Sequence, residues 1–173
     1  MENAKVVVDA TCGNGHDLLY LSKRAQKACH LYGIDIQMKA IKTSKELLQS
    51  NDIAPEVSLT FIHDSHDLAV AHQLKDEVID LMIFNLGYLP GSDHQVITKP
   101  HQTIDAINEG LEKLSKSGVI TIVAYPGTTE GFEEMQSLKS YLSDLEQKLY
   151  NVCHWHPMNQ INNPPELFIL QKR

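Results

Sequence analysis

A short segment near the N-terminus combines an apolar run, an aspartate and two glycines. Val6–Val8 ends at Asp9, and Gly13 and Gly15 follow in a turn that leads into a helix-like stretch. This pattern predicts a strand, a tight loop and a helix N-terminus, where a ligand can lie against bare backbone. Asp35 ends a second apolar run 20 residues after Gly15, where a carboxylate can accept both hydroxyls of a ribose. These positions predict a site for an adenosine-containing cofactor.

The same loop argues against a dinucleotide as that cofactor. The dinucleotide fingerprint has a third glycine three residues after the second, and Leu18 stands there. Asp17 would also repel a nearby phosphate. The acidic loop better suits a positively charged ligand without phosphate, such as S-adenosylmethionine. The plain alternative is an ordinary strand–turn–helix in which the glycines serve only the turn.

The elements that must position these residues alternate between strands and helices, with no linker or repeat. This alternation predicts one α/β domain over residues 1–173, with a doubly wound, mostly parallel sheet and an antiparallel hairpin at its C-terminal edge. The seven expected strands are Lys5–Asp9, Leu31–Ile36, Val57–His63, Val78–Leu86, Val119–Tyr125, Tyr150–His156 and Leu167–Gln171. The expected helices are Gly15–Ala28, Met38–Gln49, Asp67–Lys75, one carrying Ile104, Ile107, Leu111 and Leu114 and ended by Gly118, and one after Gly131 carrying Met135, Leu138, Leu142, Leu145 and Leu149.

Polar residues follow four of the expected strands at the edge where ligands bind in open α/β sheets. They are Asp9, Asp35, the cluster His63–His66, and Asn85. Asp64 or Ser65 could reach an adenine amino group, and His66 could stack on the adenine or bond the cofactor. Taken singly, each is more often a helix cap or a loop residue. Their shared edge favours the functional interpretation.

The fourth strand end predicts a seat for an amine. The amide oxygen of Asn85 and the carbonyl oxygen of Leu86 can both accept hydrogen bonds from N–H groups, and Tyr88 adds an aromatic ring. Held in this way, a neutral amine would direct its lone pair at a methyl-sulfonium carbon. Direct displacement then needs proximity and alignment, and no metal. A strand that simply ends in an Asn-Leu-Gly turn is the alternative.

Bulk properties narrow the class of protein. A net charge of −7 argues against a broad basic surface for nucleic acid. No apolar run approaches the length of a membrane span, and three cysteines without metal-type spacing predict reduced thiols in the cytoplasm. Cys153, His154 and His156 look metal-like, but Cys153 and His154 would face opposite sides of a strand. We therefore expect no metal site and no membrane association.

Five strings of residues together carry a family resemblance. They are Asp-Ala-Thr-Cys-Gly-Asn-Gly-His-Asp over 9–17, Asp-Ile-Gln over 35–37, Ser-His-Asp over 65–67, Phe-Asn-Leu-Gly-Tyr-Leu-Pro-Gly over 84–91 and Asn-Gln-Ile-Asn-Asn-Pro-Pro over 159–165. The chain resembles the bacterial YtqB-type, MnmM-like methyltransferases, long labelled rRNA methylases. The resemblance covers nearly the whole chain, and the last two strings are far more specific than the glycine loop.

This resemblance implies a Rossmann-like class I methyltransferase that uses S-adenosyl-L-methionine. It implies a substrate in the tRNA anticodon stem-loop, where the 5-aminomethyl group of a wobble 2-thiouridine becomes 5-methylaminomethyl, and a homodimer. Residues 85–88 would act like the Asn-Pro-Pro-Tyr loop of amino-methyltransferases, with Leu86 and Gly87 in place of its prolines. The implied cofactor contacts are Asn14, Asp17, Asp35, Gln37, Ser65 and His66.

Several other functions remain open from the sequence. An enzyme of the same fold could methylate rRNA or a small-molecule amine or hydroxyl, and the acidic net charge favours a small molecule. A non-enzymatic module that keeps the fold is a second alternative, weakened by the presence of Asp9, Asp35 and Asn85 together. A dinucleotide-dependent dehydrogenase is a third alternative, weakened by Leu18.

Overall fold

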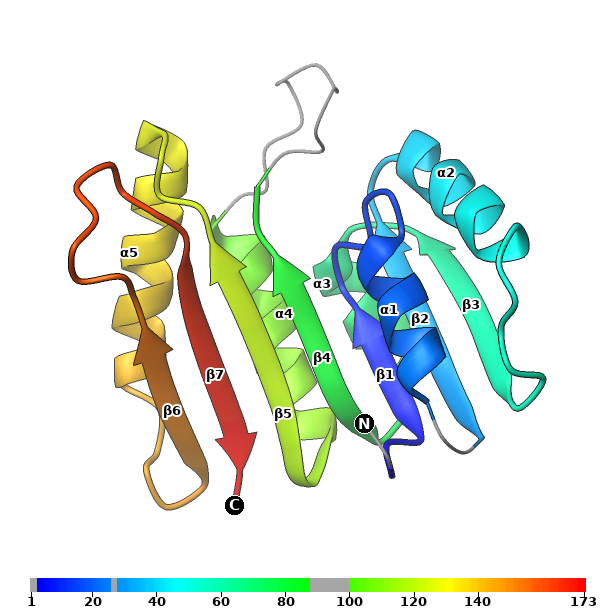
Figure 1. Ribbon diagram of the computed structural model, residues 1–173. Helices are drawn as coiled ribbons and strands as arrows, with labels where there is room; N and C mark the ends of the chain where they lie inside the picture. The colour runs from blue at the N-terminus through cyan, green and yellow to red at the C-terminus, as the bar shows by residue number, and fades with distance from the viewer. Residues whose placement is uncertain (1–2, 26–27, 88–99) are drawn as a thin grey trace.

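A seven-stranded sheet in the order β3-β2-β1-β4-β5-β7-β6 forms the centre of the protein (Figure 1). The computed structural model describes residues 3–25, 28–87 and 100–173. Strands β1 to β5 pair in parallel, while β7 runs antiparallel to both β5 and β6. The strands are β1 Val6–Asp9, β2 Cys29–Asp35, β3 Val57–His63, β4 Ile79–Asn85, β5 Leu114–Ala124, β6 Tyr150–Trp155 and β7 Glu166–Lys172. The predicted mostly parallel sheet with an antiparallel C-terminal hairpin is confirmed.

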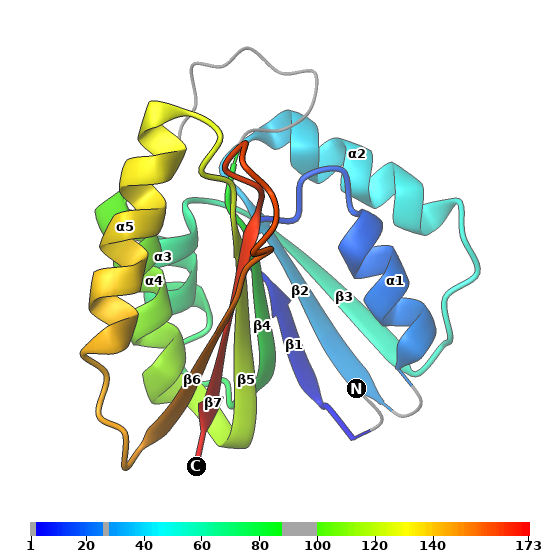
Figure 2. The same cartoon turned by 60° about the vertical axis from the view of Figure 1, so that its left-hand side comes forward.

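Helices cover both faces of this sheet (Figure 2). Helices α1 and α2 lie on one face, and α3, α4 and α5 lie on the other. Their bounds are α1 His16–Arg24, α2 Met38–Gln49, α3 His66–Leu68 followed by a π-helical turn over Ala69–Gln73, α4 Pro100–Lys113 and α5 Thr129–Ser143. No helix in the described ranges has the length and apolar character needed to span a membrane.

Two apolar cores follow from this layering, because alternate strand residues point to opposite faces. Val7 and Leu31 pack with Leu18 and Ile41 of the first two helices. Their neighbours along the strands face α4 and α5 in a larger core that includes Val8, Ile34, Met82, Phe84, Ile107, Ile120, Ile122, Met135, Leu138, Leu142 and Phe168. The central strands are therefore held by helices on both faces, with the larger core under α4 and α5.

Three helix predictions were wrong at their ends. Helix α1 stops at Arg24 rather than Ala28, since Ala25 has extended backbone angles and β2 begins at Cys29. The expected helix over 67–75 is a single α-turn followed by a π-turn. Helix α5 ends at Ser143, so Leu145 and Leu149 lie outside it.

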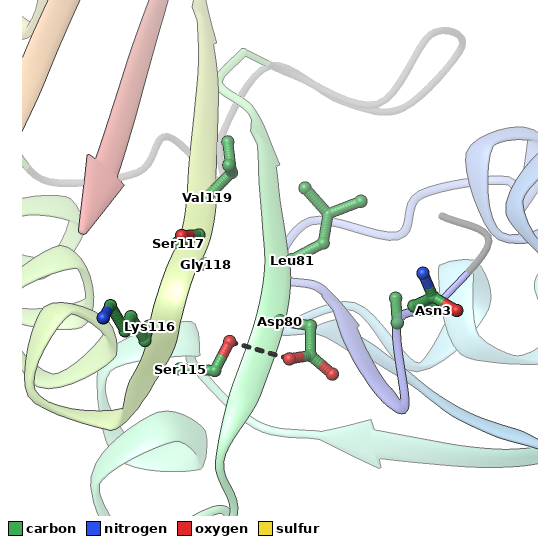
Figure 3. A pocket seen from close by; sticks show the side chains of 9 residues that line it. Asn3, Asp80, Leu81, Ser115, Lys116, Ser117, Gly118 and Val119 are labelled. Atoms are coloured by element: carbon green, nitrogen blue, oxygen red, sulfur yellow. Dashed lines mark hydrogen bonds between the residues drawn. The ribbon is translucent and has the colours of Figure 1, made fainter. Parts of the chain in front are cut away.

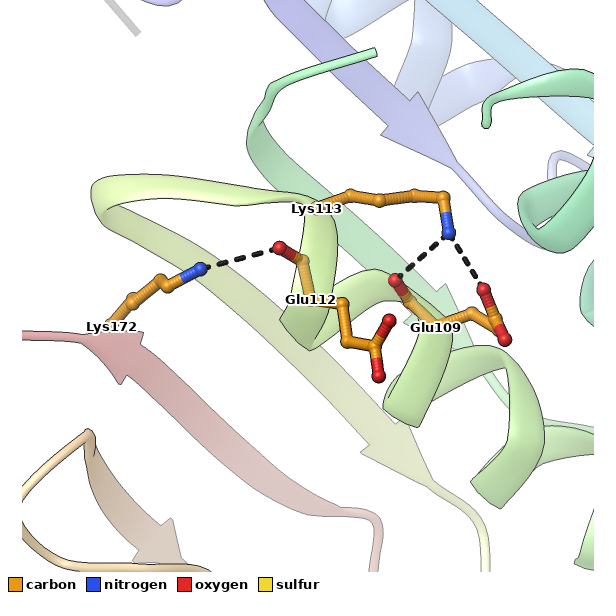
Figure 4. A network of polar contacts seen from close by, with 4 residues as sticks. All are labelled: Glu109, Glu112, Lys113 and Lys172. Carbon is orange, nitrogen blue, oxygen red and sulfur yellow. Dashed lines mark hydrogen bonds and ion pairs between the residues drawn. The ribbon is translucent and has the colours of Figure 1, made fainter. Parts of the chain in front are cut away.

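The α4–β5 junction also differs from the prediction. Helix α4 ends at Lys113, Leu114 opens β5, and Gly118 lies inside β5 rather than ending a helix. Lys172 donates to the carbonyl oxygens of Leu111, Glu112 and Leu114 at 3.3, 3.3 and 2.9 Å. Figure 4 shows this lysine beside Glu112, with the Lys113–Glu109 pair on the same helix end. A cation on these carbonyls stabilises the helix end where it lies.

Candidate active site

The glycine loop between β1 and α1 is shaped by two left-handed residues. Gly13 has φ +49° and Gly15 has φ +83°, conformations that other residues rarely adopt. A side chain on Gly15 would also collide with Ser44 of α2, whose Cα would lie 2.9 Å from the added Cβ. The Ser44 hydroxyl donates to the Gly13 carbonyl oxygen at 2.8 Å. Both glycines are therefore required, one of them by close packing as well as by conformation.

Asp35 ties this loop to the start of α2. Its two carboxylate oxygens accept hydrogen bonds from the backbone N–H groups of Gly13, at 2.9 Å, and Gln37, at 2.8 Å. Burial raises the pKa of Asp35, and these two bonds oppose the rise. Each oxygen keeps a further acceptor position, because a carboxylate has about four lone-pair sites. The carboxylate is thus held rigidly at the end of β2 and can still accept hydroxyl groups.

Asp9 is a buried carboxyl group with one unsatisfied oxygen. Its Oδ1 accepts from the backbone N–H of Thr11 at 3.1 Å, whereas Oδ2 has no hydrogen-bond partner among the described residues. Burial, with smaller contributions from the charges of Asp17 and Asp35, raises the pKa of Asp9 to about 8. The neighbouring carboxylates of Asp17 and Asp35 create a negative region that favours a cationic ligand and disfavours a phosphate.

Asn85 at the end of β4 is held by two contacts from the glycine-loop side. Its backbone N–H donates to the Thr11 hydroxyl at 2.7 Å, and its side-chain Nδ2 donates to the Asp17 carboxylate at 2.6 Å. A carboxylate only accepts, so the amide must turn its NH₂ group toward Asp17. The amide oxygen is left as the acceptor for a ligand. The predicted seat residue is therefore oriented by a residue that was predicted to bind the cofactor.

Of the other residues in the predicted amine seat, the structure describes Leu86 and Gly87. Leu86 is buried, and its backbone N–H donates to the Val123 carbonyl oxygen at 2.8 Å, which anchors this strand end to β5. Gly87 follows with φ +153°. Tyr88 lies outside the described residues.

The end of β3 places Ser65 and His66 at the start of α3. Ser65 is the N-cap residue, but its hydroxyl makes no capping bond. The His66 ring is buried edge-on against Phe84, with 5.8 Å between ring centroids. So buried a ring offers little face for stacking on an adenine, and the other expectation for His66, a bond to the cofactor, stays a prediction. Its Nε2 has no partner in the described part of the chain, and burial lowers the pKa of His66, which favours the neutral ring.

Asn14 and Gln37 complete the set of predicted cofactor contacts. Asn14 lies in the glycine loop, and Gln37 is the N-cap residue of α2; both are partly exposed. Sequence reasoning gave no role to Thr11 and Ser44, which support Asn85 and the glycine loop. No spacing signal marks Ser44, because it occupies a buried position of an amphipathic helix.

A hollow of about 640 Å³ lies at the opposite edge of the sheet (Figure 3). Asp80, near the start of β4, is the carboxylate that lines this hollow. It accepts from the backbone N–H groups of Lys5 and Val6 and from the Ser115 hydroxyl. Although burial opposes the shift, these bonds hold the pKa of Asp80 below its usual value. A satisfied carboxylate at the amino ends of the strands indicates structural support, so we place the candidate site at the other edge.

The metal-like residues in and after β6 bring two histidine rings together, His154 and His156 at 5.2 Å between centroids, but no third ligand among the residues that the structure describes. His154 Nε2 lies 2.6 Å from the Glu166 carboxylate, and its ring stacks on Phe168. Cys153 is a free, exposed thiol. Within the ranges 3–25, 28–87 and 100–173, no group of three His, Cys, Asp or Glu side chains is arranged to hold a metal ion.

Three known proteins are similar to this chain over nearly all of its length. A crystal structure of a "putative rRNA-methylase" from Clostridium thermocellum is 37% identical with a TM-score of 0.89, covering 98% of this chain and 89% of that one. SMU.1697c from Streptococcus mutans, described as a putative methyltransferase in complex with SAH, is 35% identical with a TM-score of 0.85, covering 99% and 90%. The Arabidopsis thaliana protein named "tRNA (mnm(5)s(2)U34)-methyltransferase, chloroplastic" is 27% identical over 183 residues. This chain is covered to 99% in that match but spans only 65% of the length of the Arabidopsis protein.

A family model agrees with these similarities. The model described as "Putative rRNA methylase" matches residues 31–171, which is most of the chain. The two solved relatives superpose on 98% and 99% of this chain with TM-scores of 0.89 and 0.85, so they share its fold. The chain therefore belongs to the rRNA methylase family, and it has the fold of class I S-adenosylmethionine-dependent methyltransferases.

Proposed function

We propose that this protein is an N-methyltransferase that converts the 5-aminomethyl group of a tRNA wobble 2-thiouridine to 5-methylaminomethyl. The observation that carries the proposal is the oriented amide of Asn85, whose Nδ2 is bound to Asp17 and whose oxygen is left to accept from an amine. The name of the Arabidopsis relative supports an aminomethyl uridine as the bearer of that amine.

The residues around the glycine loop fit S-adenosylmethionine. Asp35 offers a fixed carboxylate for ribose hydroxyls, and Gly13 and Gly15 allow close approach to the backbone. Asp9 has a buried oxygen without a partner in the described residues, and the carboxylate of Asp17 makes the region suited to a cation. Asn14, Gln37, Ser65 and His66 border the same edge and are the further proposed contacts. When bound, the cofactor supplies a methyl carbon on a positively charged sulfur, open to displacement by a neutral amine.

The proposed role of the chain is to bind and orient that amine. Asn85 Oδ1 and the Leu86 carbonyl oxygen accept its two N–H groups, which leaves the nitrogen lone pair free to form the new bond. The nitrogen–carbon bond forms as the carbon–sulfur bond breaks, sulfur keeps the electron pair, and the product amine releases a proton to water. Positioning of this kind contributes much of the acceleration in a displacement between two bound partners.

An rRNA substrate is the second candidate, because the family description names rRNA methylation. The two are separated by incubating the protein and labelled S-adenosylmethionine with purified tRNA and with ribosomal RNA, each from a strain that lacks this protein. Our proposal predicts label in the tRNA fraction. Label in rRNA alone would favour the second candidate, and label in neither RNA would contradict both.

The proposed oligomeric state and cellular compartment follow from the sequence. The resemblance to the MnmM-like family supports a homodimer, which size-exclusion chromatography with light scattering tests. The three cysteines are free thiols in the structure, and Cys153 is exposed, which fits a reducing compartment such as the cytoplasm.

A further inference from the structure

An exposed tyrosine stands beside the proposed amine seat. Tyr125 directly follows β5, and the strand pairing sets Asn85 opposite Val123, two residues before it. A Cβ added to Gly87 would lie 3.5 Å from Cδ2 of the Tyr125 ring, which is van der Waals contact. The ring of Tyr125 therefore borders the backbone that follows Asn85 and Leu86.

The Tyr125 ring is not part of the core. Ile122 and Ala124 of β5 are buried under the helices, whereas Tyr125 keeps 46% of its surface exposed. On the side of β4 its neighbour is Gly87, which has φ +153° and no side chain to place over the ring. An exposed large aromatic ring at the edge of a candidate site is a common feature of binding surfaces.

The backbone of Tyr125 is held firmly. Pro126 follows it and is buried, and a residue before proline is restricted to extended conformations. A side chain on Gly131 would lie 2.2 Å from the Tyr125 carbonyl oxygen, so the first turn of α5 packs directly on this residue. The Thr128 hydroxyl caps that turn by accepting from the Gly131 N–H at 3.0 Å. A ring on so rigid a support loses little conformational entropy when a ligand binds it.

Because the protein is negatively charged, stacking on such a ring is a suitable way to bind a nucleic-acid substrate. With a net charge of −7, contacts to phosphates are poorly placed to dominate binding. Stacking of an unpaired base on an aromatic side chain strengthens binding by about 5- to 150-fold and does not need a positive net charge. Phe132, one turn into α5, is a second exposed aromatic near the same connection, with 43% of its surface open.

We propose that Tyr125 is the platform on which the planar ring of the target nucleobase stacks while Asn85 holds its amine. This inference rests on the proposed function and extends it to the class of substrate. The site would select an unpaired base that bears an amine over a flexible aliphatic amine, which has no ring to stack. Tyr125 would act on substrate binding and leave cofactor binding unchanged.

Two substitutions test this role. Tyr125→Phe keeps the ring, and Tyr125→Leu keeps an apolar side chain without a π-face. At saturating S-adenosylmethionine we expect Tyr125→Leu to lower kcat/KM for tRNA at least about 10-fold, mostly through KM, from the lost stacking. Tyr125→Phe should stay within about 3-fold of the wild type by the same argument. Calorimetric binding of S-adenosylhomocysteine should be equal in all three proteins, which also shows that the variants fold.

A matched control is Tyr20→Leu, which removes another exposed tyrosine, on α1, and should leave kcat/KM unchanged. A Tyr125→Leu variant as active as the wild type overturns the platform alone, and so does a Tyr125→Phe variant as weak as Tyr125→Leu. A wild-type protein that methylates no RNA overturns the proposed function and the platform with it, so the two failures are distinguishable.

Discussion

The amide nitrogen of Asn85 donates to the carboxylate of Asp17 across 2.6 Å, joining the end of β4 to the first turn of α1. The two residues are 68 positions apart in the sequence. Because a carboxylate cannot donate at neutral pH, this contact fixes which end of the amide faces the candidate substrate. The glycine loop and the amine seat thus form one connected structure.

The first prediction concerns Asn85 itself. Asn85→Ala removes the proposed acceptor for the amine, so turnover should fall about 100-fold, as expected when a reacting group is misplaced. Affinity for S-adenosylhomocysteine, measured by calorimetry, should change little. An Asn85→Ala variant that turns over at the wild-type rate would contradict the amine-seat assignment.

The second prediction separates two roles for Asp17. If Asp17 acts by orienting Asn85, Asp17→Ala should lower kcat about 10-fold even at saturating cofactor. The double variant Asp17→Ala/Asn85→Ala should then be no slower than Asn85→Ala, because Asn85→Ala already removes the amide that Asp17 orients. Asp17→Asn retains an acceptor oxygen and should recover much of the rate. A change confined to the KM for the cofactor would assign Asp17 to cofactor binding alone.

The third prediction concerns Asp35. Asp35→Ala removes the acceptor for ribose hydroxyls, so affinity for S-adenosylhomocysteine should weaken about 10- to 100-fold, as expected for hydrogen bonds to a charged group. Isothermal calorimetry measures this directly. Asp52→Ala, which removes an exposed carboxylate elsewhere, is the matched control and should bind like the wild type. Equal affinities in the two variants would exclude Asp35 as the ribose ligand.

The fourth prediction follows from the raised pKa of Asp9. The folded protein keeps this proton up to about pH 8, while the unfolded chain releases it near 3.8. Folding therefore retains a proton between these values, and the contribution of Asp9 to stability decreases as pH rises through this window. Asp9→Asn carries no such proton. The free energy of unfolding of Asp9→Asn, relative to that of the wild type, should therefore rise by on the order of a few kcal/mol between pH 4 and pH 8.

Urea unfolding of both proteins at several pH values measures that difference. Comparing the pair cancels the other titrating groups, among them Asp35, whose raised pKa acts in the same direction, and His66, whose lowered pKa acts in the opposite one. A difference that stays constant with pH would show that Asp9 titrates normally.

Much of the fold could be predicted from local patterns. The apolar runs before Asp9 and Asp35 and the amphipathic stretch from Met38 to Gln49 specify their elements through strand and helix periodicity. The contact of Lys172 with the last carbonyl groups of α4 could not be predicted, because the two lie about 60 positions apart in the sequence.

The residues of the candidate site could be proposed from the sequence one by one, but the contacts between their side chains could not. Asp9, Asp35 and Asn85 follow apolar runs, so sheet topology alone brings them to one edge. The orientation of Asn85 by Asp17 and the support of Gly13 by Ser44 depend on side-chain contacts between separate elements, for which no sequence spacing exists. His66 shows the reverse case, since its position was predicted but its ring is buried against Phe84.

The central claim, methyl transfer to a modified wobble uridine, is tested most directly by mass spectrometry of nucleosides. Bulk tRNA from a strain lacking this protein is incubated with the purified protein and S-adenosylmethionine, then digested, with Asn85→Ala as the control. Our account predicts that 5-aminomethyl-2-thiouridine gains one methyl group with the wild type and scarcely with the variant. Unchanged 5-aminomethyl-2-thiouridine, in the presence of protein that binds S-adenosylhomocysteine, would contradict it.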